Sequence, residues 1–141
     1  MNATERDPGS RRPSTVVSAA VLVFLGGGLG SLARYGIARC FGQHATGTIP
    51  WHTFAVNLVG SLLLGALVGY AATREVSESA RAFLAVGLLG GFTTYSTFNM
   101  ETLALFEQRG ATTAAGYVLG TVLLCLVAGW SGGFIAHRFV T

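Results

Sequence analysis

Four long stretches without a formal charge occupy most of this sequence, at residues 16–33, 53–73, 82–100 and 110–136. Each reaches the roughly 18 to 20 residues that an α-helix needs to cross the hydrocarbon core of a bilayer. Only 11% of the 141 residues are charged, whereas about a quarter is usual for a soluble domain. We therefore predict an all-α integral membrane protein with four transmembrane helices, surrounded by the lipid of the cell membrane (the inner membrane in a two-membrane bacterium).

The spans are expected at about residues 16–38, 50–73, 81–107 and 111–136, so that one four-helix transmembrane domain covers residues 16–138. Residues 1–15 contain charges, two prolines and no apolar periodicity, which is typical of a disordered polar tail. The basic residues are all Arg, and those in the tail suit anionic lipid headgroups. No basic cluster indicates a nucleic-acid surface, and we expect no nucleic-acid partner.

The third span contains an unusual stretch for a lipid-facing helix, residues 90–98, which read Gly-Gly-Phe-Thr-Thr-Tyr-Ser-Thr-Phe. Adjacent glycines loosen a helix, and Ser and Thr side chains can satisfy backbone groups that a local break sets free. Irregular backbone at membrane depth persists only where it is buried in protein or lines a polar cavity. We predict that the third helix is broken near its middle, at residues 90–94, and that this break is the functional part.

Beyond the predicted break, Tyr95 and Phe98 are three residues apart and share one helix face. Thr94, Thr97 and Glu101 follow the adjacent stripe, with Glu101 towards the aqueous end. Aromatic pairs at helical spacing are commonly core residues. Packing inside the bundle and contact with a ligand are therefore both open for this pair.

The second span places Asn57, Ser61, Gly65 and Gly69 at intervals of four residues, on one helix face. Small residues at this spacing allow close helix packing, and Asn can act as interhelical glue. The alternative is that Asn57 offers its amide donors to something inside the bundle. Spacing alone does not identify the ligand.

The fourth span carries a line of hydrogen-bonding or weakly polar groups, Tyr117, Thr121 and Cys125, again four residues apart. Both a structural role and a polar path along the helix fit this line. Small-xxx-small pairs in the same span, which favour close packing, are Gly116 with Gly120 and Gly129 with Gly133.

The first span ends in a glycine-rich segment followed by Arg34. Gly26 and Gly30 form a small-xxx-small pair that allows another helix to approach closely. Arg34 falls near a membrane boundary, where its side chain either extends to water or holds positive charge at a vestibule. An anion-handling protein would use the second arrangement.

Enzymatic activity is not expected, because the sequence has no nucleotide-binding loop, nucleophile–base arrangement or pair of carboxylates. His44, His52 and His137 are dispersed near predicted membrane boundaries, which disfavours a zinc site. Cys40 lies just past the first span and Cys125 lies mid-span. We expect both thiols to stay unpaired, because their close approach is improbable.

The arginines bias the orientation of the chain only weakly. An even number of spans places both termini on one side, and without the tail each side carries three arginines. A weak positive-inside bias allows insertion in either orientation. This leaves open an antiparallel dimer, which would also supply the helices that four short spans lack for a complete pore.

Three motifs, in order and each in its own span, resemble the CrcB/Fluc family of fluoride channels. They are residues 26–35 (Gly-Gly-Gly-Leu-Gly-Ser-Leu-Ala-Arg-Tyr), residues 56–61 (Val-Asn-Leu-Val-Gly-Ser) and residues 90–98, followed by Glu101. The resemblance covers nearly the whole chain after the tail. It implies an antiparallel, dual-topology homodimer with two pores, which exports fluoride passively and relieves fluoride toxicity.

By this resemblance, Asn57 hydrogen-bonds fluoride while Tyr95 and Phe98 contact it through their ring edges. Fluoride is small and tightly hydrated, so a pore must replace its water with hydrogen-bond donors, and aromatic edges carry partial positive charge. Two positions depart from the usual family pattern: Tyr95 replaces Phe, and Cys125 replaces a hydroxyl residue. The expected pore residues are Asn57, Thr94, Tyr95, Ser96, Thr97, Phe98, Tyr117, Thr121 and Cys125.

The resemblance also assigns Arg34 to a vestibule and matches Glu101 to a glutamate of the third helix. It further implies one structural sodium ion at the dimer axis, bound by the backbone carbonyls of Gly90 and Thr93. Carbonyls freed by a helix break need a partner, and a cation supplies one.

Two other functions are compatible with four short spans. A small dual-topology multidrug or guanidinium exporter needs a membrane-embedded carboxylate, for which Glu101 is the only candidate. A non-transporting accessory subunit would use its small-xxx-small faces to bind another protein. Substrate-dependent proton coupling would indicate the exporter, and a stable homodimer without a partner would count against the accessory subunit.

Overall fold

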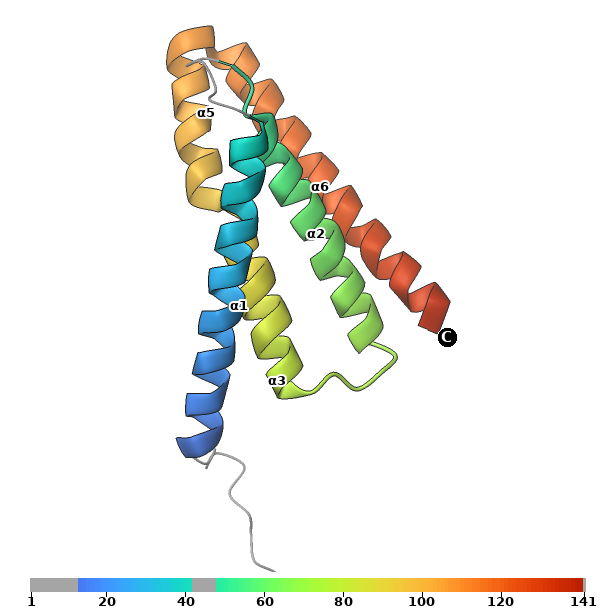
Figure 1. Ribbon diagram of the computed structural model, residues 1–141. Helices are drawn as coiled ribbons and strands as arrows, with labels where there is room; N and C mark the ends of the chain where they lie inside the picture. The colour runs from blue at the N-terminus through green and yellow to red at the C-terminus, as the bar shows by residue number, and fades with distance from the viewer. Residues whose placement is uncertain (1–12, 42–47, 141) are drawn as a thin grey trace, which may run out of the picture.

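The computed structural model describes residues 13–41 and 48–140, and this part of the chain contains helices and no strand (Figure 1). The all-α prediction is confirmed for these residues. The elements are α1 (Pro13–Cys40), α2 (Trp51–Ala71), α3 (Glu78–Arg81), the π-helix η1 (Ala82–Leu89), α4 (Gly90–Phe92), α5 (Tyr95–Arg109) and α6 (Ala111–Val140).

Three helical segments, Val17–Cys40, Trp51–Ala71 and Ala111–Val140, are each long and apolar enough to cross a membrane. They match the first, second and fourth predicted spans. The third predicted span is built instead from the shorter consecutive elements α3, η1, α4 and α5. The start of α1 and the end of α6 lie at the same end of the molecule, at the bottom of Figure 1.

The helices pack as two pairs. In the first pair, α1 packs against the continuous segment of η1 and α4. In the second pair, α2 packs against α6, and α5 also lies against α6. The pairs converge towards the end that holds the α5–α6 connection and diverge towards the other end (Figure 1). The residues between α4 and α5 lie near the middle of this arrangement, where parts of all three long helices approach them.

Glycines set the close approach within both pairs. A Cβ at Gly30 would overlap the Leu88 carbonyl oxygen of η1, and one at Gly65 would overlap the backbone of Gly129 on α6. These contacts confirm close packing through the small residues of the first two spans. The predicted pair Gly116 and Gly120 behaves differently, because a Cβ at either position meets no atom of this chain within 4 Å.

Replacement of Gly65 by Ala is therefore expected to force α2 and α6 apart and to destabilise the fold by about 1–3 kcal/mol. Backbone atoms of Gly129 surround the new methyl group, and they cannot move aside as a flexible side chain would. Thermal unfolding of the purified protein measures the loss, with Gly120→Ala as the matched control. Equal unfolding temperatures for the two variants would contradict the packing role of Gly65.

The first helix begins at Pro13, before the predicted end of the tail at Thr15. Residues 1–12 of the predicted tail 1–15 lie outside the described residues, as do residues 42–47 of the loop before α2. Helix α1 begins at Pro13 and so includes the last three residues assigned to the tail. Proline suits the first turn of a helix, because the N–H that it lacks has no intrahelical partner there.

The glycine pair of the third predicted span does not interrupt the helix. Gly90 and Gly91 are helical, and the extended residues are Thr93 (φ −76°, ψ 158°) and Thr94 (φ −149°, ψ 121°). Gly91 serves packing instead, since a Cβ there would lie 2.5 Å from the Gly27 carbonyl oxygen of α1. The π-helical turns before this point are a second irregularity, of a kind often found at functional sites.

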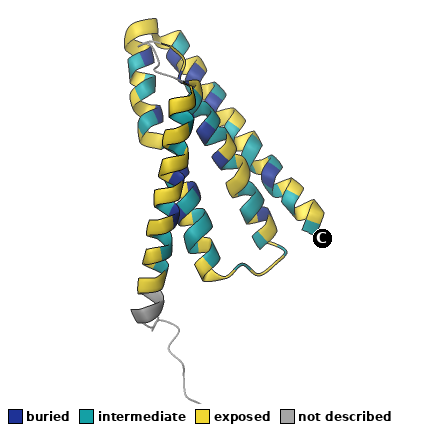
Figure 2. Ribbon diagram, viewed as in Figure 1, coloured by how far each residue is buried: buried dark blue, intermediate teal, exposed yellow. Residues whose placement is uncertain are grey.

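Most of the surface of the long helices is exposed and apolar, and buried residues gather where α2, α5 and α6 meet (Figure 2). The core cluster there consists of Phe98, Leu105, Ala114 and Tyr117. An apolar surface of this extent suits lipid or another protein chain rather than water. Both cysteines are free in this structure, with Cys40 exposed and Cys125 half-buried.

Candidate functional site

The interruption between α4 and α5 is held by Asn57 of α2. The Asn57 Nδ2 donates to the Thr94 carbonyl oxygen at 3.1 Å, and the Thr94 N–H donates to Asn57 Oδ1 at 2.9 Å. The amide side chain thus replaces the backbone partners that Thr94 loses outside a helix. An Asn amide has two N–H donors, so this pairing leaves a second hydrogen for another acceptor.

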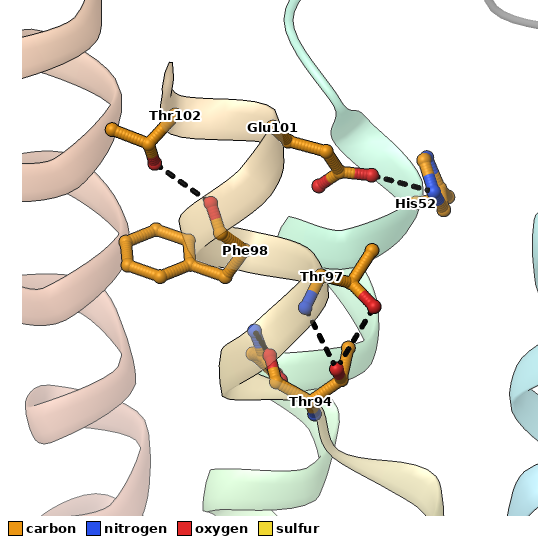
Figure 3. Close-up of polar contacts among 7 residues, drawn as sticks. His52, Thr94, Thr97, Phe98, Glu101 and Thr102 are labelled. Atoms are coloured by element: carbon orange, nitrogen blue, oxygen red, sulfur yellow. Dashed lines mark hydrogen bonds and ion pairs between the residues drawn. The ribbon is translucent and has the colours of Figure 1, made fainter. Parts of the chain in front are cut away.

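Threonine side chains shape both sides of the interruption. Thr93 Oγ1 donates to the Leu89 carbonyl oxygen at 2.9 Å. Thr94 caps α5, because its Oγ1 accepts from the Thr97 N–H at 3.3 Å and contacts Thr97 Oγ1 at 3.0 Å (Figure 3). Side-chain capping satisfies the orphan donors of a helix start, which explains how a two-residue break is tolerated here.

Arg34 of α1 also reaches this point. Its Nε donates to the Gly91 carbonyl oxygen at 3.2 Å, and Ser31 Oγ approaches the same oxygen at 3.5 Å. Gly91 lies in the last helical turn before the extended residues, where a cation is favoured by the helix dipole. Arg34 is half-buried, so the structure adds a third role to the two considered from sequence: it ties α1 to the end of α4.

An open groove of about 350 Å³ runs beside the interruption. Polar groups from α2, the α4–α5 junction and α6 line it together with aliphatic side chains. Eight of the residues predicted for the site line this groove, namely Asn57, Gly90, Thr93, Thr94, Tyr95, Phe98, Thr121 and Cys125.

The two aromatic residues of the third predicted span have different environments. Phe98 is only 8% exposed and packs on Tyr117, with ring centroids 5.3 Å apart and planes tilted by 39°. Tyr95 is 79% exposed, although its ring centroid lies 6.0 Å from that of Phe98. Phe98 is therefore both a core residue and a wall of the groove, whereas Tyr95 lines the groove with a largely exposed ring.

The polar line of α6 is buried at its centre. Tyr117 and Thr121 are 7% and 5% exposed, and neither hydroxyl meets a hydrogen-bond partner of regular geometry within the described part of the chain. Buried hydroxyls without partners cost free energy unless a water or a ligand satisfies them. Thr121 opens into the groove, and Tyr117 lies behind Phe98.

A family model described as "CrcB-like protein, Camphor Resistance (CrcB)" matches residues 21–133, which include the groove and the interruption. Similar proteins named "Fluoride-specific ion channel FluC" occur in Sorangium cellulosum, with 43% identity over 82% of this chain and 92% of the relative. The relative from Rhodopseudomonas palustris is 42% identical over 86% of this chain and 98% of its own length. The relative from Anaeromyxobacter sp. strain K is 48% identical over 83% of this chain and 94% of its own length.

This chain belongs to the CrcB family. It is a multi-pass protein of the cell membrane, and the family consists of ion channels rather than enzymes. The family match begins inside α1 and ends inside α6, so it covers every element that contributes to the groove.

A second cavity of about 270 Å³ lies between α1, α2 and α5 of this CrcB-family chain. Arg34, His52 and Thr97 are among its lining residues, and Thr94 lines both cavities. Glu101 contacts His52 beside it, with Oε1 and Nε2 3.2 Å apart (Figure 3). Figure 3 shows Phe98 pointing to the other side of α5.

Three observations differ from what sequence reasoning indicated for the site. Ser96 is exposed and Thr97 lines only the second cavity, so neither hydroxyl faces the groove with Asn57. His52 was counted as a dispersed boundary residue, yet it contacts Glu101. No sequence spacing indicates that contact, because the two residues lie on different helices.

The carbonyls of Gly90 and Thr93 lose their helical N–H donors at the interruption. In a continuous helix the N–H groups of Thr94 and Thr97 would donate to them, but these donate to Asn57 Oδ1 and Thr94 Oγ1 instead. Within the described chain, no group of three or more His, Cys, Asp or Glu side chains could hold a metal.

Proposed function

We propose that this chain forms a fluoride-selective channel that exports fluoride passively across the cell membrane. The observation that carries the proposal is the groove at the interruption, where the remaining Asn57 amide hydrogen and the buried Thr121 hydroxyl, which has no hydrogen-bond partner of regular geometry among the described residues, offer donors to an ion. Fluoride must exchange its water for such donors in a narrow passage. The names of the relatives support the same ion.

The walls of the groove suit an anion of this size. Phe98 is fixed by its packing on Tyr117, and an aromatic edge is the positive part of the ring quadrupole. Asn57 is fixed by its two hydrogen bonds to Thr94. Donors held rigidly in a small site favour fluoride over chloride, because the larger ion cannot approach all of them at once.

We further propose that two copies assemble as an antiparallel, dual-topology homodimer with two pores, and that the α3–α5 region forms one broken transmembrane span. One protomer leaves the groove open and the Tyr95 ring exposed, and a second copy would close the groove over Tyr95. Light scattering of the purified protein tests the dimer. A tag at one terminus that is accessible from both sides of the membrane tests the dual topology, and one-sided access would contradict it.

A structural sodium ion is part of this proposal, held by the carbonyls of Gly90 and Thr93. The ion would neutralise carbonyl dipoles that the interruption leaves without their helical donors. Replacement of sodium by a large organic cation on both sides of the membrane is expected to lower both thermal stability and fluoride efflux. Unchanged unfolding temperature and efflux would exclude the site.

Fluoride efflux from liposomes that contain the purified protein tests the function directly. An ion-selective electrode follows fluoride, and chloride efflux from the same preparation is the control. We expect rapid fluoride loss with chloride loss no faster than from protein-free vesicles. A well-folded protein that releases no fluoride would refute the proposed function.

A further inference from the structure

His52 and Glu101 form a side-chain contact that the proposed pore does not explain, and this contact is an ion pair only when the imidazole is protonated. His52 lies in the first turn of α2, and its Nε2 is 3.2 Å from Oε1 of Glu101 on α5 (Figure 3). Their side chains are only 17% and 21% exposed. A partly buried carboxylate is costly without a partner, and the imidazole of His52 gives Glu101 a cationic partner whenever the ring is protonated.

The pair lies beside the second cavity, which shares the lining residue Thr94 with the groove. Among the described residues, the titratable and charged groups near His52 include Glu101 from α5 and, at the cavity of about 270 Å³, Arg34 and Tyr35 from α1. Thr94 lines this cavity and also the groove beside Asn57. An anion that entered through this cavity would meet the charge of this cluster before it reached Thr94.

We propose that His52 is a positioning residue that holds Glu101 against α2 and, through its own protonation, sets the charge that an anion meets at the entrance. The proposal rests on the proposed function. With Arg34 cationic and Glu101 ionised, protonation of His52 changes the net charge of the cluster from zero to +1. A positive entrance raises the local concentration of anions, and imidazole changes its charge between about pH 5 and 8.

Fluoride efflux from liposomes is accordingly expected to rise about three- to tenfold as the pH falls from about 8 to about 5.5. Protein-free vesicles at each pH correct for leakage of hydrogen fluoride. The His52→Gln variant should release fluoride at every pH as slowly as the wild-type protein does at about pH 8. The His52→Arg variant, which keeps a positive charge, should release fluoride at every pH as fast as the wild-type protein does at about pH 5.5. His137→Gln, which changes a histidine at the far end of α6, is the matched control and should keep the wild-type profile.

A flat profile in an active wild-type channel, or a wild-type profile in His52→Gln, would overturn the proposal. The positioning role also has a readout that does not depend on transport. If His52 holds Glu101, the double variant His52→Gln/Glu101→Gln should lose no more thermal stability than the more damaging single variant. Additive losses would refute the positioning role. Absence of fluoride efflux at every pH, with this coupling intact, would refute the proposed function instead.

Discussion

Replacement of Asn57 by Asp is expected to reduce fluoride efflux at least about 100-fold, the size of loss that removal of one essential hydrogen-bond donor produces in a buried polar site. The carboxylate can still accept from the Thr94 N–H, as Oδ1 does now at 2.9 Å. Its second oxygen, however, would face the Thr94 carbonyl oxygen to which Nδ2 donates at 3.1 Å. The variant thus loses both donors and places a negative charge where an anion must pass.

The same substitution should also lower stability, because two oxygen atoms would oppose each other at the interruption. Liposome efflux and thermal unfolding, measured on one preparation, separate the two effects. Asn99→Asp makes the same chemical change at an exposed position of α5 and serves as the control. Efflux from Asn57→Asp at the wild-type rate would mean that the ion path does not pass this side chain.

Replacement of Phe98 by Ile should be the next most damaging change, with fluoride efflux reduced about ten- to 100-fold, because a ring edge that faces an anion is lost. Phe98 is 8% exposed, lines the groove and packs on Tyr117. Ile fills much of the space but carries no ring, and it leaves the Tyr117 ring without the aromatic neighbour that packs on it at a tilt of 39°. The remaining wall is aliphatic and offers fluoride no partial positive charge.

Phe106→Ile is the matched comparison, because this ring lies on the same helix and is exposed. We expect it to transport at the wild-type rate. Some loss of stability in Phe98→Ile is expected from the smaller side chain in the core, so efflux should be normalised to the amount of folded protein. Equal efflux from the two variants would place the pore away from Phe98.

Residues from three helices hold the interrupted backbone in place. Asn57 reaches it from α2, Arg34 and Ser31 reach it from α1, and Thr94 caps the start of α5. Each of these contacts replaces a hydrogen bond that a regular helix would make for itself. The irregular backbone is therefore held by the fold, as structure at membrane depth requires.

The features that could be predicted from the sequence are those that depend on local composition. Long uncharged runs predict apolar helices, and three of the four predicted spans correspond to single helices of sufficient length. Small residues at intervals of four predict close packing, which is observed at Gly30 and Gly65. The mixture of glycines and hydroxyl residues in 90–98 indicated the region of irregular backbone, because both residue types disfavour a regular helix.

Other features were assigned incorrectly or remained undecided, since they depend on which helices meet. The pair Gly90 and Gly91 is helical, and the extended backbone falls on the two threonines that follow. Gly116 and Gly120 make no close contact within the chain. Arg34 is tied to a carbonyl rather than extended to water. In each case the outcome depends on a neighbouring backbone that the sequence pattern does not specify.

The sequence by itself determined that this chain lies in a membrane, which segments are helical and where its polar groups are concentrated, because hydropathy and helix propensity act within a few residues. Only the tertiary structure decided that the Asn57 amide is shared with Thr94, that Phe98 packs on Tyr117 and that His52 contacts Glu101. These groups lie on different helices. Their contacts arise from the way in which glycine-mediated packing aligns one helix against another, and no local pattern encodes that alignment.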